Sequence, residues 1–154
     1  VLTVAGCGDP DPAGPASESG QYAGREGAVG GLIDFHASDA TVTRIRRAMT
    51  DAGIDGSVAV AALVNRSDRL IPIPTFTAHR LNGRSTVLQR ADRLPELDAA
   101  DVSGAGTYVP VQGALTVYLV MAGTYRDVTD VGMRVGIDPE ITLRPQRTDG
   151  ARAR

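Results

Sequence analysis

The chain contains 154 residues with a formal net charge of −2, and 42% of its residues are hydrophobic. This length is enough for one domain with a substantial core. Its 16 basic residues, all arginine, are interspersed with 18 acidic residues. Because no basic stripe is available to neutralise phosphates, the composition argues against a nucleic-acid partner. The single cysteine, Cys7, excludes an internal disulfide framework and a cysteine-rich zinc site.

Small and apolar residues precede Cys7. The run from Val4 to Cys7 resembles the lipobox of bacterial lipoproteins, in which a cysteine after small residues is acylated. The resemblance implies that residues 1–6 are a remnant of a signal peptide and that Cys7 carries a lipid anchor, such as palmitate, on the extracytoplasmic face of the cell membrane. The use of arginine alone as the basic residue is similarly typical of actinobacterial proteins. The alternative is an ordinary apolar strand with an incidental cysteine.

The segment after the cysteine is dense in glycine, proline, alanine and serine up to Gly27. Such a segment buries too little apolar surface to offset the entropy of ordering it. We therefore expect residues 7–27 to be a flexible, lipidated linker and residues 28–147 to form one folded domain. The tail, residues 148–154, is expected to be disordered.

The first part of this domain is ambiguous. Ser38 and Asp39 resemble a helix cap, and Gly53 is a plausible helix stop after apolar residues at helical spacing. A short helix near residues 40–52 therefore competes with a strand from Leu32 to about Ile45. The threonines and β-branched residues in the first half favour the strand.

The remaining segments indicate strands. Residues 58–64 and 114–121 are continuous apolar runs, typical of strands covered on both faces, whereas residues 131–137 alternate as in a half-buried strand. Pro72 and Pro74 restrict residues 70–76 to an edge strand or a bent entrance to the next strand.

The dipeptide Asn82-Gly83 predicts a two-residue type I′ turn between two strands. With Leu81 opposite Arg84, this turn places His79 across from Thr86. Phe76, Ala78 and Val87 then share one face, while His79 lies on the other face with Leu81 and Leu88.

Several short strands within about 120 folded residues indicate an all-β fold, an antiparallel β-sandwich with at most one short helix. The pattern weakly resembles the immunoglobulin-like and cupredoxin-like domains of bacterial surface lipoproteins. The resemblance depends on the opening from Asp34 to Val42, the segment from Gly56 to Asp68 and a late strand that begins at Gly113. The tryptophan and cysteine pair of antibody domains are absent from the sequence.

No recognisable catalytic constellation accompanies these strands. Hydrolytic chemistry needs a nucleophile, a base and an orienting acid. The two candidate bases, His36 and His79, lie in no nucleophile motif, and no G-x-S-x-G sequence occurs. We therefore expect no enzymatic activity and no resident cofactor.

Copper binding is the alternative, because exported copper chaperones with a similar β-sandwich hold Cu(I) with histidine and methionine. The residues available for this role are His36, Met49 and His79. However, Leu81 occupies the position of the second methionine that a His-x-Met pair would require.

The sequence thus predicts an exported, membrane-anchored lipoprotein whose domain is a binding or accessory module for an extracellular protein or cell-wall partner. The surfaces expected to bind are the Pro72/Pro74 segment, the Asn82-Gly83 tip and the loop from Ala99 to Tyr108. The arginines of residues 44–47 form a basic cluster, which we interpret as a solvated face.

Overall fold

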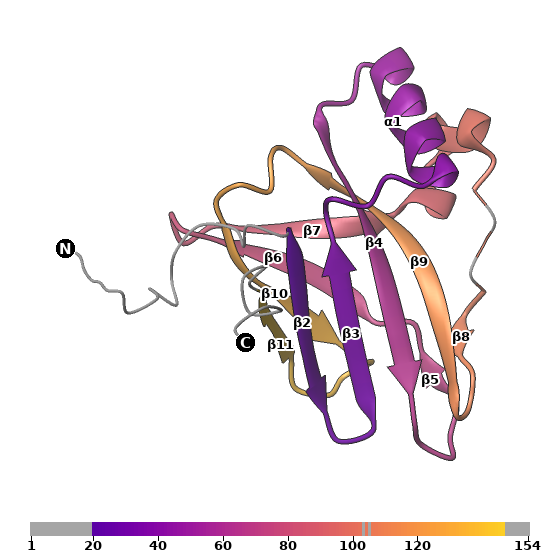
Figure 1. Ribbon diagram of the computed structural model, residues 1–154, viewed down its shortest axis with the longest axis vertical. Helices are drawn as coiled ribbons and strands as arrows, with labels where there is room; N and C mark the ends of the chain where they lie inside the picture. The colour runs from indigo at the N-terminus through magenta and orange to yellow at the C-terminus, as the bar shows by residue number, and fades with distance from the viewer. Residues whose placement is uncertain (1–19, 103, 105, 147–154) are drawn as a thin grey trace, which may run out of the picture.

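The computed structural model describes residues 20–102, 104 and 106–146. The protein is mostly β, with one short helix, and eight of its strands close into a barrel (Figure 1). The order around the barrel is β10-β11-β2-β3-β4-β9-β7-β6, and every neighbouring pair described is antiparallel. The helices and strands are β2 (Gln21–Glu26), β3 (Val29–Asp34), α1 (Ala40–Ala52), β4 (Gly56–Asn65), β5 (Ile71–Pro72), β6 (Thr75–Arg80), β7 (Ser85–Arg90), η1 (Ala91–Arg93), η2 (Pro95–Ala100), β8 (Tyr108–Val109), β9 (Gly113–Ala122), β10 (Val128–Arg134) and β11 (Ile141–Pro145).

The closed barrel corrects the expectation of a β-sandwich. In a sandwich the two sheets keep free edges, whereas here β6 pairs with β10 from Thr75 to Arg80 and β7 reaches β9. The contact between β7 and β9 is short, with only Gln89 opposite Val120 and Arg90 opposite Leu119. The barrel therefore has a narrow seam between these strands, beyond which they separate.

The folded domain begins earlier than predicted. Residues 21–26, assigned to the linker from the sequence, form β2 and pair with β3 along their whole length. Tyr22 explains the difference, because this one large side chain is fully buried in the barrel and its hydroxyl donates to the Val128 carbonyl at 2.9 Å. One aromatic residue thus anchors a segment that is otherwise poor in apolar groups.

The preference for a strand up to Ile45 was also wrong. The strand β3 ends at Asp34, and residues 40–52 form α1. Asp39 caps the helix by accepting from the Val42 amide at 2.8 Å, and Gly53 ends it in the left-handed conformation at φ 71°. The periodic apolar residues prevail over β propensity because they pack against a second core.

This second core lies outside the barrel. One face of α1 and the helix η2 cover the end of β4 and β9, over Val58 and Val120. The barrel's own core contains the larger cluster, whose biggest members include Tyr22, Phe76, Ile33, Leu63, Leu119, Met121, Met133 and Leu143. Where β4 and β9 lie beneath α1 and η2, which we call their helical end, apolar residues therefore pack on both faces of the sheet. Elsewhere they pack only on the inner face.

The β6–β7 hairpin forms where Asn82-Gly83 predicted it, but the register differs by one residue. His79 lies opposite Ser85 and not Thr86. Of the two turn residues Asn82 and Gly83, only Gly83 has positive φ, at 85°, and its amide donates to the Arg80 carbonyl. The loop therefore has three residues, residues 81–83, and a bulge. A shift of one residue exchanges the faces of β7: Leu88 is buried and Val87 is 59% exposed.

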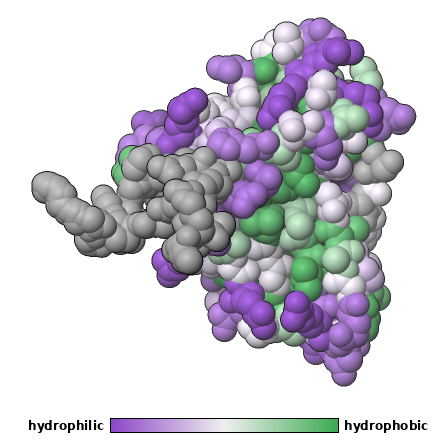
Figure 2. Space-filling view, viewed as in Figure 1, coloured by the Kyte–Doolittle hydropathy of each residue, from purple (hydrophilic) through white to green (hydrophobic). Residues whose placement is uncertain are grey.

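The predicted apolar strands are confirmed as β4 and β9, and the alternating strand as β10. However, β10 ends at Arg134, and Ile137 is 97% exposed. The expectation that β4 and β9 are covered on both faces holds only at their helical end. Over the rest of β3 and β4, apolar residues gather on the outer surface (Figure 2).

A buried polar residue fixes the end of β4. Asn65 is fully buried, and its Nδ2 donates to the Arg69 carbonyl at 2.8 Å and to the Val109 carbonyl at 3.3 Å. Its Oδ1 accepts from the Ser67 amide at 3.0 Å. Asn65 therefore holds the turn after β4 and the position of β8 together.

Candidate functional site

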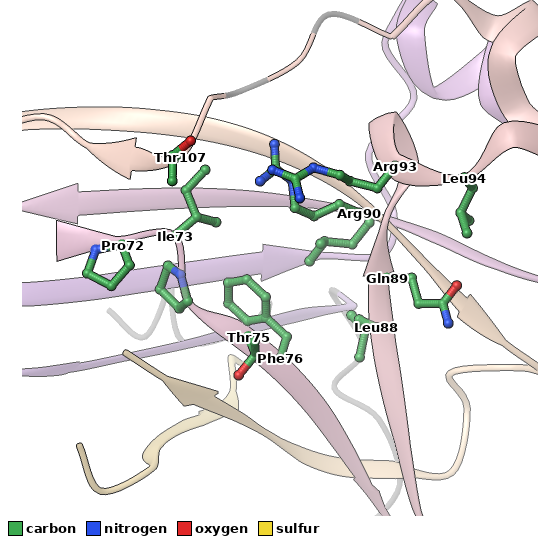
Figure 3. Close-up of a pocket in the computed structure, with 12 residues that line it drawn as sticks. Pro72, Ile73, Thr75, Phe76, Leu88, Gln89, Arg90, Arg93, Leu94 and Thr107 are labelled. Atoms are coloured by element: carbon green, nitrogen blue, oxygen red, sulfur yellow. The ribbon is translucent and has the colours of Figure 1, made fainter. Parts of the chain in front are cut away.

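A groove opens where the seam between β7 and β9 ends. After Arg90 the chain turns away into η1, while β9 continues beside β4. The bend between β5 and β6 lies on the opposite side, and Thr107 closes one end. The space is about 570 Å³, within the range of small-molecule sites, and Figure 3 shows the side chains that line it. Its lining residues are Pro72, Ile73, Pro74, Thr75, Phe76, Leu88, Gln89, Arg90, Arg93, Leu94, Thr107 and Leu119.

The groove has an apolar floor. Phe76, Leu88 and Leu119 point inward from three strands and are 1%, 5% and 1% exposed, as members of the barrel core. Ile73 and Leu94 add partly buried aliphatic surface. Because these side chains belong to a packed core, the floor is rigid and already formed.

The charged groups of the groove are two arginines. Arg90 is held in place, since its Nε and Nη2 donate to both oxygens of Asp92 at 3.1 and 2.8 Å, and its Nη1 donates to the Gly106 carbonyl at 3.0 Å. Arg93 is exposed, makes no hydrogen bond or ion pair within the described part of the chain, and reaches over the groove near Arg90 (Figure 3).

The groove is therefore apolar below and positive at one rim. None of the described residues that line it is acidic, and Asp92 is already engaged by Arg90. For the arginine that remains, Arg93, no described residue compensates the charge. This arrangement suits a molecule with an apolar body and an acidic group, because arginine pairs well with carboxylates and phosphates.

Two of the three surfaces singled out from the sequence meet at this groove. Pro72 and Pro74 form one wall, and Thr107 comes from the loop between Ala99 and Tyr108. The Asn82-Gly83 tip is absent from its lining. No sequence pattern pointed to Arg90 and Arg93, because their position at the groove depends on where the pairing of β7 with β9 ends, which is a long-range contact.

The three candidate copper ligands have different neighbours. His36 contacts the Tyr125 hydroxyl through Nε2. His79 contacts Ser85 Oγ through Nδ1 at 3.0 Å and Glu140 Oε1 through Nε2 at 3.2 Å. Met49 is 3% exposed and packs in the core beneath α1. Its thioether thus serves as core packing. Among the described residues no group of three or more His, Cys, Asp or Glu side chains could hold a metal ion.

The other sequence-derived candidates lie elsewhere. Cys7 falls outside the described residues. In the basic cluster on α1, Arg44 Nε donates to the Ala100 carbonyl at 3.0 Å, while Arg47 is exposed, so part of the cluster holds η2 against the helix. The helices of the described segments include none that is long and apolar enough to span a membrane.

A second cavity of about 610 Å³ lies between the β2–β3 turn and the β10–β11 connection. Its apolar lining includes Val29, Ile71 and Ile141, but its charges are mixed, with Arg69 among several acidic residues. The groove at the end of the β7–β9 seam, called the seam groove below, is lined by basic but not acidic side chains. It is therefore the better candidate of the two for binding a ligand of one charge sign.

None of the protein-family models, curated proteins or solved structures compared with the chain matches it.

Proposed function

We propose that this protein is a binding module, and that the seam groove binds an apolar molecule that carries one acidic group. The observation that supports this proposal is the combination of a preformed apolar floor with Arg93, which is unpaired among the described residues. The apolar body of the ligand would displace water from the accessible apolar lining, Pro72, Ile73 and Leu94, which is favourable in proportion to the area covered. The acidic group would pair with Arg93 at the rim.

Arg90 has a supporting role in this proposal. Its guanidinium is fixed by Asp92, which compensates its charge, and by the Gly106 carbonyl, so it forms an immobile part of the groove wall beside Arg93. Preorganised groups of this kind lower the entropy lost on binding. Arg93 supplies the direct contact.

The test is isothermal titration with dodecanoate, using dodecanol as the uncharged ligand of matched chain length. We expect saturable binding of dodecanoate and weaker binding of dodecanol. Arg93→Glu is expected to weaken dodecanoate binding by about tenfold or more, equivalent to about 1.4 kcal/mol. Arg47→Glu, at an exposed position on α1, is the matched control and should bind like the wild type. Equal loss in both variants, or no saturable binding, would refute the proposed site.

We also propose that the module is an exported lipoprotein, tethered through Cys7 at the extracytoplasmic face of the cell membrane, where its partners are extracellular or cell-wall components. The support is the lipobox-like run from Val4 to Cys7. Expression with a complete bacterial export signal should give a membrane-bound, acylated protein, whereas Cys7→Ala should appear in the soluble fraction without the mass of the lipid. Membrane retention of Cys7→Ala would contradict the proposed anchor.

A further inference from the structure

The outer face of β2, β3, β4 and β9 carries few charged side chains between its two ends. The register of these strands places the outward residues in rows across the sheet. The rows, taken from β2 to β9, are Gln21, Asp34, Val60 and Tyr118 at the helical end, then Ala23, Leu32, Ala62 and Thr116, then Arg25, Gly30, Val64 and Ala114. We call the last two rows, with Arg66 beyond them, the outer sheet face.

This largely apolar face is accessible to solvent, since Ala62 and Ala114 are exposed and Leu32 and Val64 are half-buried. The cover provided by α1 and η2 reaches Val58 and Val120 and partly protects Val60 and Tyr118. It does not extend to Ala62, which is exposed, and Figure 2 shows apolar surface over the middle of this part of the molecule. A continuous apolar sheet face of this kind is a frequent mark of a protein interface.

The shape of the face is complementary to itself. A shallow hollow of about 310 Å³ lies over Gly30, where β3 has no outward side chain, and Leu32 and Val64 line it on either side. The hollow at Gly30 and the half-buried Leu32 occupy successive outward positions of β3. Consider a two-fold axis that lies in the plane of the interface, runs across the strands, and passes between the rows of Ala62 and Val64. Rotation about this axis would set Leu32 of each copy opposite Gly30 of the other. Such an interface is the isologous type found in symmetric dimers.

Apart from Arg25, which is exposed at the β2 edge of the face, the charges at its two ends agree with the same symmetry. Arg66 lies past one end of the face, is exposed, and has no side-chain partner among the described residues. Asp34 lies at the other end, on the row of Val60. The rotation that pairs Leu32 with Gly30 also brings Arg66 of one copy next to Asp34 of the other, twice per dimer. From this complementarity of shape and charge, we propose that a second copy of this chain docks on the outer sheet face.

Sedimentation velocity of the full chain, from roughly 1 to 100 µM, tests this proposal. A reductant is included so that Cys7 cannot cross-link two chains. The wild type is expected to shift from monomer to dimer with concentration. Ala62→Arg, which places two like charges close to the two-fold axis, should stay monomeric throughout. Val87→Arg, at an exposed position on β7 outside this face, should dimerise like the wild type.

A second pair of variants tests the charges. Arg66→Glu should weaken dimerisation by about tenfold, because it sets a carboxylate beside Asp34 of the other copy. Arg84→Glu, at the exposed hairpin tip, makes the same charge change elsewhere and should leave dimerisation unchanged. A wild type that is monomeric at every concentration would overturn the proposal. The outer sheet face would then have to be covered by residues 1–19 of the same chain or by a different protein. Dimers that persist in Ala62→Arg, with native thermal unfolding, would also overturn it.

Discussion

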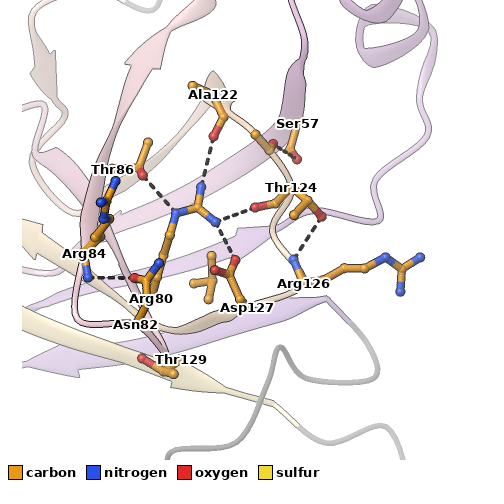
Figure 4. A network of polar contacts seen from close by, with 12 residues as sticks. Ser57, Arg80, Asn82, Arg84, Thr86, Ala122, Thr124, Arg126, Asp127 and Thr129 are labelled. Atoms are coloured by element: carbon orange, nitrogen blue, oxygen red, sulfur yellow. Dashed lines mark hydrogen bonds and ion pairs between the residues drawn. The ribbon is translucent and has the colours of Figure 1, made fainter.

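Arg80 joins the β6–β7 hairpin to the loop between β9 and β10 (Figure 4). Its Nε donates to Thr86 Oγ1 at 3.0 Å and its Nη1 to Asp127 Oδ1 at 2.5 Å. Its Nη1 and Nη2 also reach the carbonyls of Thr124 and Ala122 at 2.7 and 3.0 Å. The Arg80 side chain is 11% exposed, whereas Asp127 is 37% exposed. We predict that Arg80→Met, which keeps an apolar stem of similar length, destabilises the fold.

The magnitude follows from the exposure of each contact. The two carbonyls are solvent-accessible, so water replaces the lost donors at little cost. The contacts with Thr86 and Asp127 are partly buried, and each such bond contributes about 1–1.5 kcal/mol. The sum is a loss of about 2–3 kcal/mol in the free energy of unfolding. For a domain of this size that loss lowers the Tm by about 10 °C.

Urea denaturation followed by circular dichroism measures this loss, and a thermal melt checks the Tm. Arg84→Met is the matched control, because Arg84 is exposed four residues further along the same hairpin and its side chain makes no hydrogen bond within the described residues. It should change stability by less than about 0.5 kcal/mol. If Arg80→Met is as stable as this control, the network contributes nothing net and the reasoning fails.

Two further predictions concern the fold. Leu88→Ala should lose about 2–4 kcal/mol of unfolding free energy in urea titrations, because Leu88 is buried in the barrel. Val87→Ala should lose less than about 0.5 kcal/mol. A larger loss for Val87→Ala than for Leu88→Ala would support the register predicted from the sequence instead. Asp39→Ala should cost about 1 kcal/mol, seen as a lower Tm, because the Val42 amide loses its acceptor. An unchanged Tm would show that water replaces this cap.

Local features of the fold could be predicted from the sequence. The apolar runs located β4 and β9, and the cap at Asp39 and stop at Gly53 located both ends of α1. The decision between helix and strand failed because it depends on the cover that Val58 and Val120 require. The hairpin register failed because Asn-Gly also suits a three-residue loop with Gly83 in the left-handed conformation.

Closure of the barrel was beyond local patterns. It depends on pairs between distant segments, such as β6 with β10 and β2 with β11, which no spacing in the sequence encodes. The same limit explains why Arg93 was missed. Its position over a groove follows from where β7 leaves β9, and nothing near Arg93 in the sequence marks that point.

The strand β9 takes part in both proposed interactions because successive residues of a strand face opposite sides. Its inward residue Leu119 lies in the floor of the groove, whereas its outward residues Ala114 and Thr116 border the outer sheet face. The two sites are thus on opposite surfaces of one sheet layer, so a ligand in the groove and a second copy on the outer face do not compete for side chains. Dodecanoate binding should accordingly be unchanged in Ala62→Arg, and dimerisation unchanged in Arg93→Glu, which makes the two proposals independently testable.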